Sequence, residues 1–169
     1  MNQEVYQFFT NDHHRIEQIL EKAIIHLDAI DMELYNDFRI HLLTHIKMEE
    51  KIFFPAALQA NNGVPLPLAA KLRLDHGALT SLVVVPPNAE IIKVIQYILE
   101  KHDLLEEAPG GMYDVCGQLT KDQTTILLEK LKSTTLVPVH PCNTHTSVLG
   151  AAKRSVARAG FDYDEIVRS

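Results

Sequence analysis

One arrangement of histidine and glutamate occurs twice in the chain, each time on a stripe of apolar residues with helical spacing. In each half a single histidine precedes a His-x-x-x-Glu pair, and the six residues are His13, His45, Glu49, His76, His102 and Glu106. Side chains four positions apart on a helix differ by only about 40° around its axis, so both members of a pair face the same side. The chain must therefore fold so that polar groups from several helices meet in an apolar interior.

Helical periodicity predicts the elements that carry this pattern. We expect helices over about residues 3–9, 12–29, 32–58, 67–84, 89–107, 120–133 and 144–159. The side chains of Thr10 to Asp12 are suitable helix caps and predict a break there, and Thr120 with Gln123 matches a capping box. Turn-forming Pro, Gly and Asn residues separate the longer helices.

The two halves resemble a weak internal duplication, in which a helix with one histidine is followed by a helix with His-x-x-x-Glu. We therefore expect an all-α protein built on an up-down four-helix bundle, with its site on the inward faces. Residues 1–115 would form this bundle. Residues 116–169 would form a helical extension that packs on the bundle or builds a homodimer interface.

Composition excludes several classes of protein. The chain has 169 residues, 46% of them hydrophobic, and a net charge of −6, which fits one folded domain. It has no long Lys or Arg run of the kind that nucleic-acid binding requires. Met1 to Val5 lack the features of a signal peptide, and no apolar run approaches the ~20 residues of a membrane helix. We expect a cytoplasmic protein with no nucleic-acid or membrane partner, in which Cys116 and Cys142 are reduced.

The six polar residues predict a metal centre. Burying two carboxylates without partners would cost on the order of several kcal/mol each, and no Lys or Arg shares their helix faces. Four imidazoles with two carboxylates suit iron, manganese or zinc better than calcium or magnesium, which prefer oxygen ligands. Because one carboxylate can bridge two ions, the set predicts a pair of transition-metal ions.

These motifs resemble the hemerythrin family, in its bacterial His-His-Glu cation-binding branch. The similarity covers about residues 8–115, and its motifs are Asp12-His13, His45 to Pro55, Asp75-His76 and His102 to Glu107. It implies a hemerythrin-like bundle with a non-haem di-iron centre, in which two glutamates and an oxo or hydroxo group bridge two Fe ions. The implied metal ligands are His13, His45, Glu49, His76, His102 and Glu106. Zinc or manganese is the alternative metal.

One position departs from the oxygen-carrying members of that family. They have His-x-x-x-His on the third helix, whereas the residue four places after His76 is Thr80. The change removes one imidazole and leaves coordination positions open. It favours reaction with oxygen, peroxide or nitric oxide over reversible oxygen carriage.

Several neighbouring residues have competing interpretations. His14 adjoins His13 but shares a face with polar residues, so His13 is the preferred ligand. His41 lies at the edge of an apolar stripe, where it would be packed, a further ligand or a hydrogen-bond partner of one. Glu50 and Glu107 are rotated by about 100° from the preceding glutamates, which predicts a place on the surface or behind the ligands.

The C-terminal third offers weaker candidates. Tyr113 follows the turn at Gly110 and Gly111, where it could close over the site. A second metal or redox site is the less favoured interpretation, because its residues fit no common zinc spacing; they are Cys116, His140, Cys142 and His145.

Three functions share one constellation of ligands. The first is a sensor or protective redox protein that binds or reacts with a small diatomic molecule or peroxide. The second is an iron donor or store, for example for iron–sulfur cluster repair. The third is an interaction module with a structural metal. The sequence identifies no catalytic residue, and it does not decide whether the protein is an enzyme.

Overall fold

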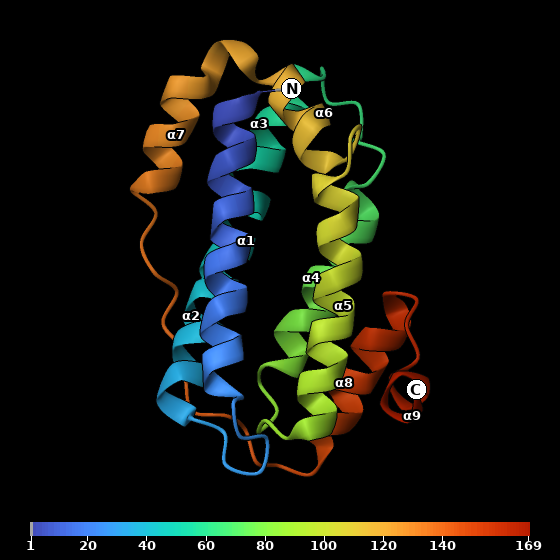
Figure 1. The fold of residues 1–169 in the computed structure, drawn as a ribbon. Coiled ribbons are helices and arrows are strands. Elements are labelled where there is room, and N and C mark those ends of the chain that lie inside the picture. The colour runs from blue at the N-terminus through green and yellow to red at the C-terminus, as the bar shows by residue number, and fades with distance from the viewer. Residues whose placement is uncertain (1) are drawn as a thin grey trace.

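The computed structural model describes residues 2–169, and all the regular elements in that range are helical (Figure 1). The four longest helices are α1 (Gln3–Ala23), α2 (Met32–Met48), α4 (Ala69–Leu82) and α5 (Ala89–Glu107). A π-helical turn, η1 (Glu49–Phe53), and α3 (Phe54–Ala60) continue α2 along the same path. Successive long helices alternate in direction, so the predicted all-α bundle is confirmed.

The break predicted near Thr10 is wrong, because α1 is continuous from Gln3 to Ala23. The Thr10 hydroxyl donates to the Gln7 carbonyl within the same helix, at 3.4 Å. The Asp12 carboxylate accepts from His45 on α2 instead of capping a helix. A tertiary contact thus uses the Asp12 side chain, whereas the Thr10 side chain bonds within its own helix. The helix also ends earlier than expected, since the predicted range reached residue 29.

The second long helix runs from Met32 to Ala60, close to the expected 32–58, but its middle is a π-helical turn. It ends where Asn62 and Gly63 adopt left-handed backbone conformations, with φ of 56° and 75°. The helix α5 matches the predicted range 89–107. Its first turn is capped by Asn88, whose side chain accepts from the Ile91 amide at 2.9 Å.

Two apolar cores lie at opposite ends of the bundle. The first packs the later part of α1 and the start of α2 against α4, α5 and α8; its buried residues include Phe38, Leu82, Ile95 and Val156. The second packs the start of α1 against η1, α3, α6 and α7; its buried residues include Phe9, Phe53, Met112 and Leu131. The six polar residues of the repeated pattern fall between these cores, which keep water away from both ends of the site.

The C-terminal part wraps around the bundle (Figure 1). Helix α6 (Met112–Leu119) packs against the end of α5, and α7 (Thr124–Lys132) lies beside α1. The segment 133–146 then follows α2 to the opposite end, and along the way the Val137 amide donates to the Thr44 hydroxyl at 2.9 Å. Helix α8 (Ser147–Arg158) packs on α4, and α9 (Tyr163–Arg168) packs on α5. The division of the chain at residue 115 stays a prediction.

The capping box predicted at Thr120 and Gln123 does not form. The Thr120 hydroxyl donates to the Cys116 carbonyl at 2.7 Å, and a 3₁₀ turn, η2 (Lys121–Gln123), precedes α7. Within residues 2–169, no helix combines the length and the apolar character needed to cross a membrane.

Candidate metal centre

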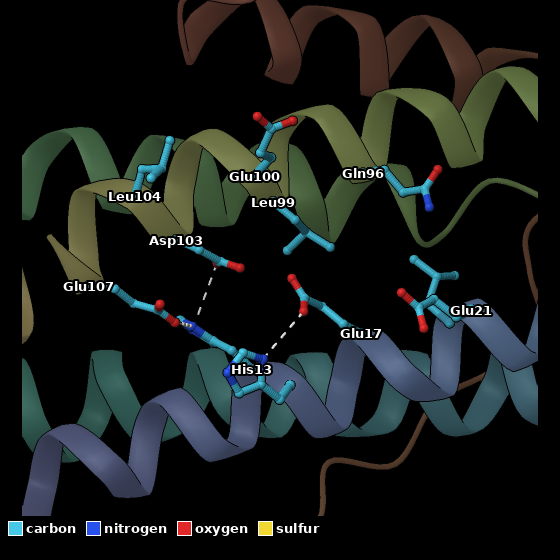
Figure 2. Close-up of a pocket in the computed structure, with 11 residues that line it drawn as sticks. His13, Glu17, Glu21, Gln96, Leu99, Glu100, Asp103, Leu104 and Glu107 are labelled. Carbon is cyan, nitrogen blue, oxygen red and sulfur yellow. Dashed lines mark hydrogen bonds and ion pairs between the residues drawn. The ribbon is translucent and has the colours of Figure 1, made fainter.

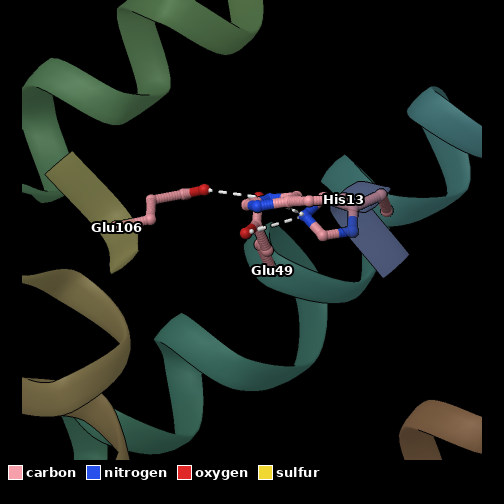
Figure 3. Close-up of side chains that lie close together, drawn as sticks. His13, Glu49 and Glu106 are labelled. Carbon is pink, nitrogen blue, oxygen red and sulfur yellow. Dashed lines mark hydrogen bonds and ion pairs between the residues drawn. The ribbon is translucent and has the colours of Figure 1, made fainter. Parts of the chain in front are cut away.

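Four imidazoles and two carboxylates converge between the two cores, on the inner faces of four helices. The side chains of Glu49 and Glu106 are completely buried, and the four histidines are buried around them. Figure 3 shows His13, Glu49 and Glu106 pointing towards one another from separate helices. The structure therefore brings together all six residues of the repeated pattern.

The six residues form two overlapping groups, and each group could hold a metal ion. We call His13, His45, Glu49 and Glu106 group one, and Glu49, His76, His102 and Glu106 group two. Within each group the potential ligand atoms lie within 4.8 Å of one another. Glu49 and Glu106 belong to both groups, so each carboxylate has an oxygen for either side.

The π-helical turn places two consecutive glutamates at the site. Glu49 begins η1 and points between the groups, with Oε2 3.0 Å from His76 Nε2. Glu50 follows it and reaches the other nitrogen of the same ring, since Oε1 lies 2.8 Å from His76 Nδ1. Single π turns inside α-helices recur at functional sites, where they redirect side chains. Glu50 therefore lies directly behind a histidine of the centre.

Each of the four histidines has a carboxylate on its outer nitrogen, Nδ1. The pairs and distances are Glu107 with His13 at 2.6 Å, Asp12 with His45 at 2.8 Å, Glu50 with His76 at 2.8 Å and Asp75 with His102 at 3.3 Å. An ionised carboxylate only accepts hydrogen bonds, so Nδ1 carries a proton and Nε2 faces inward, where it can bind a metal ion once it is deprotonated. Carboxylate-supported imidazole is the usual arrangement of histidine ligands at metal sites.

Three of these outer carboxylates are held in turn by cations. Arg15 pairs with Asp12, Lys71 pairs with Asp75, and Arg73 Nε lies 3.5 Å from Glu50 Oε2. The centre is thus layered. The two buried glutamates lie innermost, the histidines surround them, the outer carboxylates lie behind the histidines, and basic groups lie at the surface. This order fixes the orientation of the imidazole rings without a metal.

Charge inside the centre is balanced by the histidines. Burial alone would lower the pKa of His45, but the Glu49 carboxylate raises it to about 9. Burial likewise opposes protonation of His102, yet Glu106 raises its pKa to about 10. Burial would raise the pKa of Glu49, and the charge of His45 instead holds it well below its usual range. The metal-free centre is therefore a set of buried imidazolium–carboxylate pairs.

Three potential ligand atoms of group two are not satisfied by hydrogen bonds in the described part of the chain. Glu49 Oε2, His76 Nε2 and Glu106 Oε1 are buried and lack a hydrogen-bond partner within residues 2–169. The 3.0 Å approach of His76 Nε2 to Glu49 Oε2 is an ion-pair contact without hydrogen-bond alignment. Unsatisfied buried polar atoms are costly, and a bound cation would satisfy all three. The donor set and this deficit both fit a transition-metal ion.

Group one contains a further polar atom, the hydroxyl of Tyr113. Its oxygen lies 2.5 Å from Glu49 Oε1, 2.9 Å from Glu106 Oε2 and 2.9 Å from His13 Nε2, and 3.2 Å from His45 Nε2. Burial raises the pKa of this phenol well above its ordinary value, and the two carboxylates add to the effect. Tyr113 thus reaches into the centre, as its place after the glycine turn suggested.

A cleft lies between α1 and α5 (Figure 2). Its volume is about 390 Å³, and His13 of group one is among the residues that line it. Five acidic residues line it; they are Glu17, Glu21, Glu100, Asp103 and Glu107. Burial raises the pKa of Asp103 to about 6. The negative charge of this cleft favours the passage of cations over that of anions.

The alternative residues lie elsewhere. His14 is 69% exposed and pairs loosely with Glu17, whereas His13 is 6% exposed. His41 contacts Arg15 at 2.9 Å and belongs to neither group. Thr80 is exposed on α4.

The less favoured second site, at Cys116, His140, Cys142 and His145, does not form a metal-binding group in the described chain. Cys116 is completely buried in the second core, and burial raises the pKa of its thiol to about 12. This environment keeps the thiol protonated and unreactive.

The sequence interpretation missed the roles of Asp12 and Asp75. Both immediately precede a histidine, but each supports the histidine of a different helix. The signal was present in the repeated Asp-His dipeptide.

Comparison with protein-family models, with curated proteins and with solved structures found no match.

Proposed function

We propose that the chain is a hemerythrin-like non-haem di-iron protein that binds or reacts with oxygen, peroxide or nitric oxide, as a sensor or protective redox protein. One observation carries the proposal most directly: the two groups of potential ligands share Glu49 and Glu106. Shared carboxylates suit a pair of ions held side by side. His13 and His45 would anchor one ion, and His76 with His102 the other.

The residues of the chain would prepare the centre for this chemistry. The outer carboxylates fix each imidazole with Nε2 inward, and the two apolar cores exclude water from both ends. When bound, reduced iron supplies electrons and open coordination positions for small molecules. Group two contains two imidazoles and two carboxylates, and Thr80 is exposed and adds no ligand to it, which supports an open ligand position there.

The test begins with anaerobic loading of the purified chain with ferrous iron, followed by elemental analysis. We expect about two irons per chain, and then a rapid spectral change on mixing with oxygen, peroxide or nitric oxide. His102→Ala should lose iron and the rapid phase, whereas His14→Ala, which changes an exposed histidine, should keep both. Iron bound at full stoichiometry but inert to all three reagents would contradict the proposal.

One observation favours a second function, iron donation or storage. The acidic cleft between α1 and α5 includes His13 in its lining and would give a cation a route between solvent and group one. A donor must release its metal readily. Transfer of iron to a chelator within minutes at neutral pH would favour this function, and retention over many hours would oppose it.

A further inference from the structure

The hydroxyl of Tyr113 is a polar group in the centre that the repeated pattern does not explain. Its oxygen lies 2.5 to 3.2 Å from all four potential ligand atoms of group one. Its hydrogen bonds are with these atoms and not with His76 or His102. It therefore marks a difference between the two groups, which are otherwise alike in composition.

The ring of Tyr113 is held firmly in this position. It stacks on Phe9 with ring centres 5.0 Å apart, lies 6.3 Å from Phe53, and is 1% exposed. The preceding Gly111 allows α6 to approach the end of α5, because a Cβ there would lie 2.7 Å from the carbonyl oxygens of Leu105 and Ala108. Burial and these ring contacts restrict the movement of the side chain.

Metal–ligand distances determine whether the Tyr113 hydroxyl can contact a bound ion. Nitrogen and oxygen ligands lie about 2.0–2.2 Å from a bound zinc ion, and other transition metals are similar. An ion bound by the four atoms of group one must occupy the space that these atoms surround, and the hydroxyl oxygen already lies there. The ion and the oxygen cannot share one position, so the ion must lie about one metal–ligand distance from the oxygen, and the packing of the ring on Phe9 and Phe53 keeps the oxygen that close.

We propose that Tyr113 is a seventh metal-binding residue, whose phenolate oxygen coordinates the group-one ion. This assignment rests on the proposed di-iron function. The phenol proton passes to solvent as the oxygen binds the cation. Group two has no such residue, and its unsatisfied atoms remain those of Glu49, His76 and Glu106. The two ions therefore have unlike surroundings, with a hard phenolate on one side and open coordination on the other.

The test uses the full-length protein loaded with iron and oxidised to the ferric state. Iron–phenolate coordination gives a visible charge-transfer band, and excitation within that band enhances the phenolate vibrations in the Raman spectrum. We expect both signals in the wild-type protein and their loss in Tyr113→Phe, with faster release of one of the two irons to a chelator. The matched control is Tyr35→Phe, which changes another fully buried tyrosine, in the first core, and should keep both signals.

The outcomes separate this proposal from the proposed function. Two irons per chain without phenolate signals would overturn the role of Tyr113 and leave the di-iron centre intact, with the phenol acting as a hydrogen-bond donor to the glutamates. A chain that binds no iron would overturn both. If Tyr113→Phe fails to fold, the Raman spectra of the wild type and of Tyr35→Phe still test the proposal. Phenolate vibrations in both spectra require an iron-bound tyrosine other than Tyr35. The absence of these vibrations refutes the proposal.

Discussion

Removing the outer carboxylate of one histidine should weaken one metal position. Glu50 Oε1 accepts from His76 Nδ1 at 2.8 Å, and this bond fixes both the ring orientation and the tautomer that presents Nε2. Loss of such a partner typically costs 10- to 100-fold in metal affinity, which corresponds to about 1.4–2.7 kcal/mol. We therefore expect Glu50→Ala to lower the affinity of the group-two ion by a factor in this range. Glu50→Gln, which keeps an acceptor without the charge, should fall near the lower end.

The assay is a competition titration of metal-free protein with ferrous iron or zinc against a chelator. Glu100→Gln is the control, since this glutamate is 67% exposed and its carboxylate pairs with Lys101 and not with a histidine of the centre. In a His76→Ala background, Glu50→Ala should cause little further loss of metal affinity, because Glu50 acts on the metal through His76. Unchanged affinity in Glu50→Ala, or an equal loss in Glu100→Gln, would refute the role of the outer carboxylates.

Three further predictions concern ligand choice, pH and packing. His13→Ala should reduce bound iron in elemental analysis and His14→Ala should not; equal loss from both would contradict the inward assignment of His13. In the metal-free protein the pKa values of His45 and His102 are about 9 and 10, above the ordinary 6.5. The ion pairs of these two histidines therefore stabilise the fold fully below pH 6.5. This stabilisation is lost as pH rises through 9 and 10. Metal binding at pH 7 should therefore release at least two protons, one from each of these rings, which calorimetry in buffers of different ionisation enthalpy measures, and binding without proton release would contradict the pairing. Phe38→Ala, in the first core, should lower the free energy of unfolding by about 3–5 kcal/mol in denaturant titrations without changing iron content. A loss below about 1 kcal/mol would show that this core is looser than its burial indicates.

Local periodicity predicted the long helices and the inward side chains, but not the bounds of α1. A spacing of four residues puts His45 with Glu49 and His102 with Glu106 on one face whatever the rest of the fold does. The bounds of α5 followed from Asn88 before it and Pro109 after it, because both signals are local. That these residues are metal ligands stays a prediction.

The features that escaped prediction depend on how helices are placed relative to one another. Asp12 looked like a helix cap, and only the approach of α2 gives its carboxylate a better partner in His45. The π turn at Glu49 has no sequence signature comparable to a proline or glycine. Tyr113 was recognised as a candidate, but its hydroxyl reaches group one only because α6 docks closely at Gly111.

The central claim is that Glu49 and Glu106 hold two ions side by side between the two pairs of histidines. X-ray absorption at the iron edge tests it most directly, because scattering between neighbouring irons reports their separation. We expect iron–iron scattering at no more than about 4 Å, in a first shell of nitrogen and oxygen. Iron bound to the chain without iron–iron scattering would contradict the account, since the two groups would then hold only one ion between them.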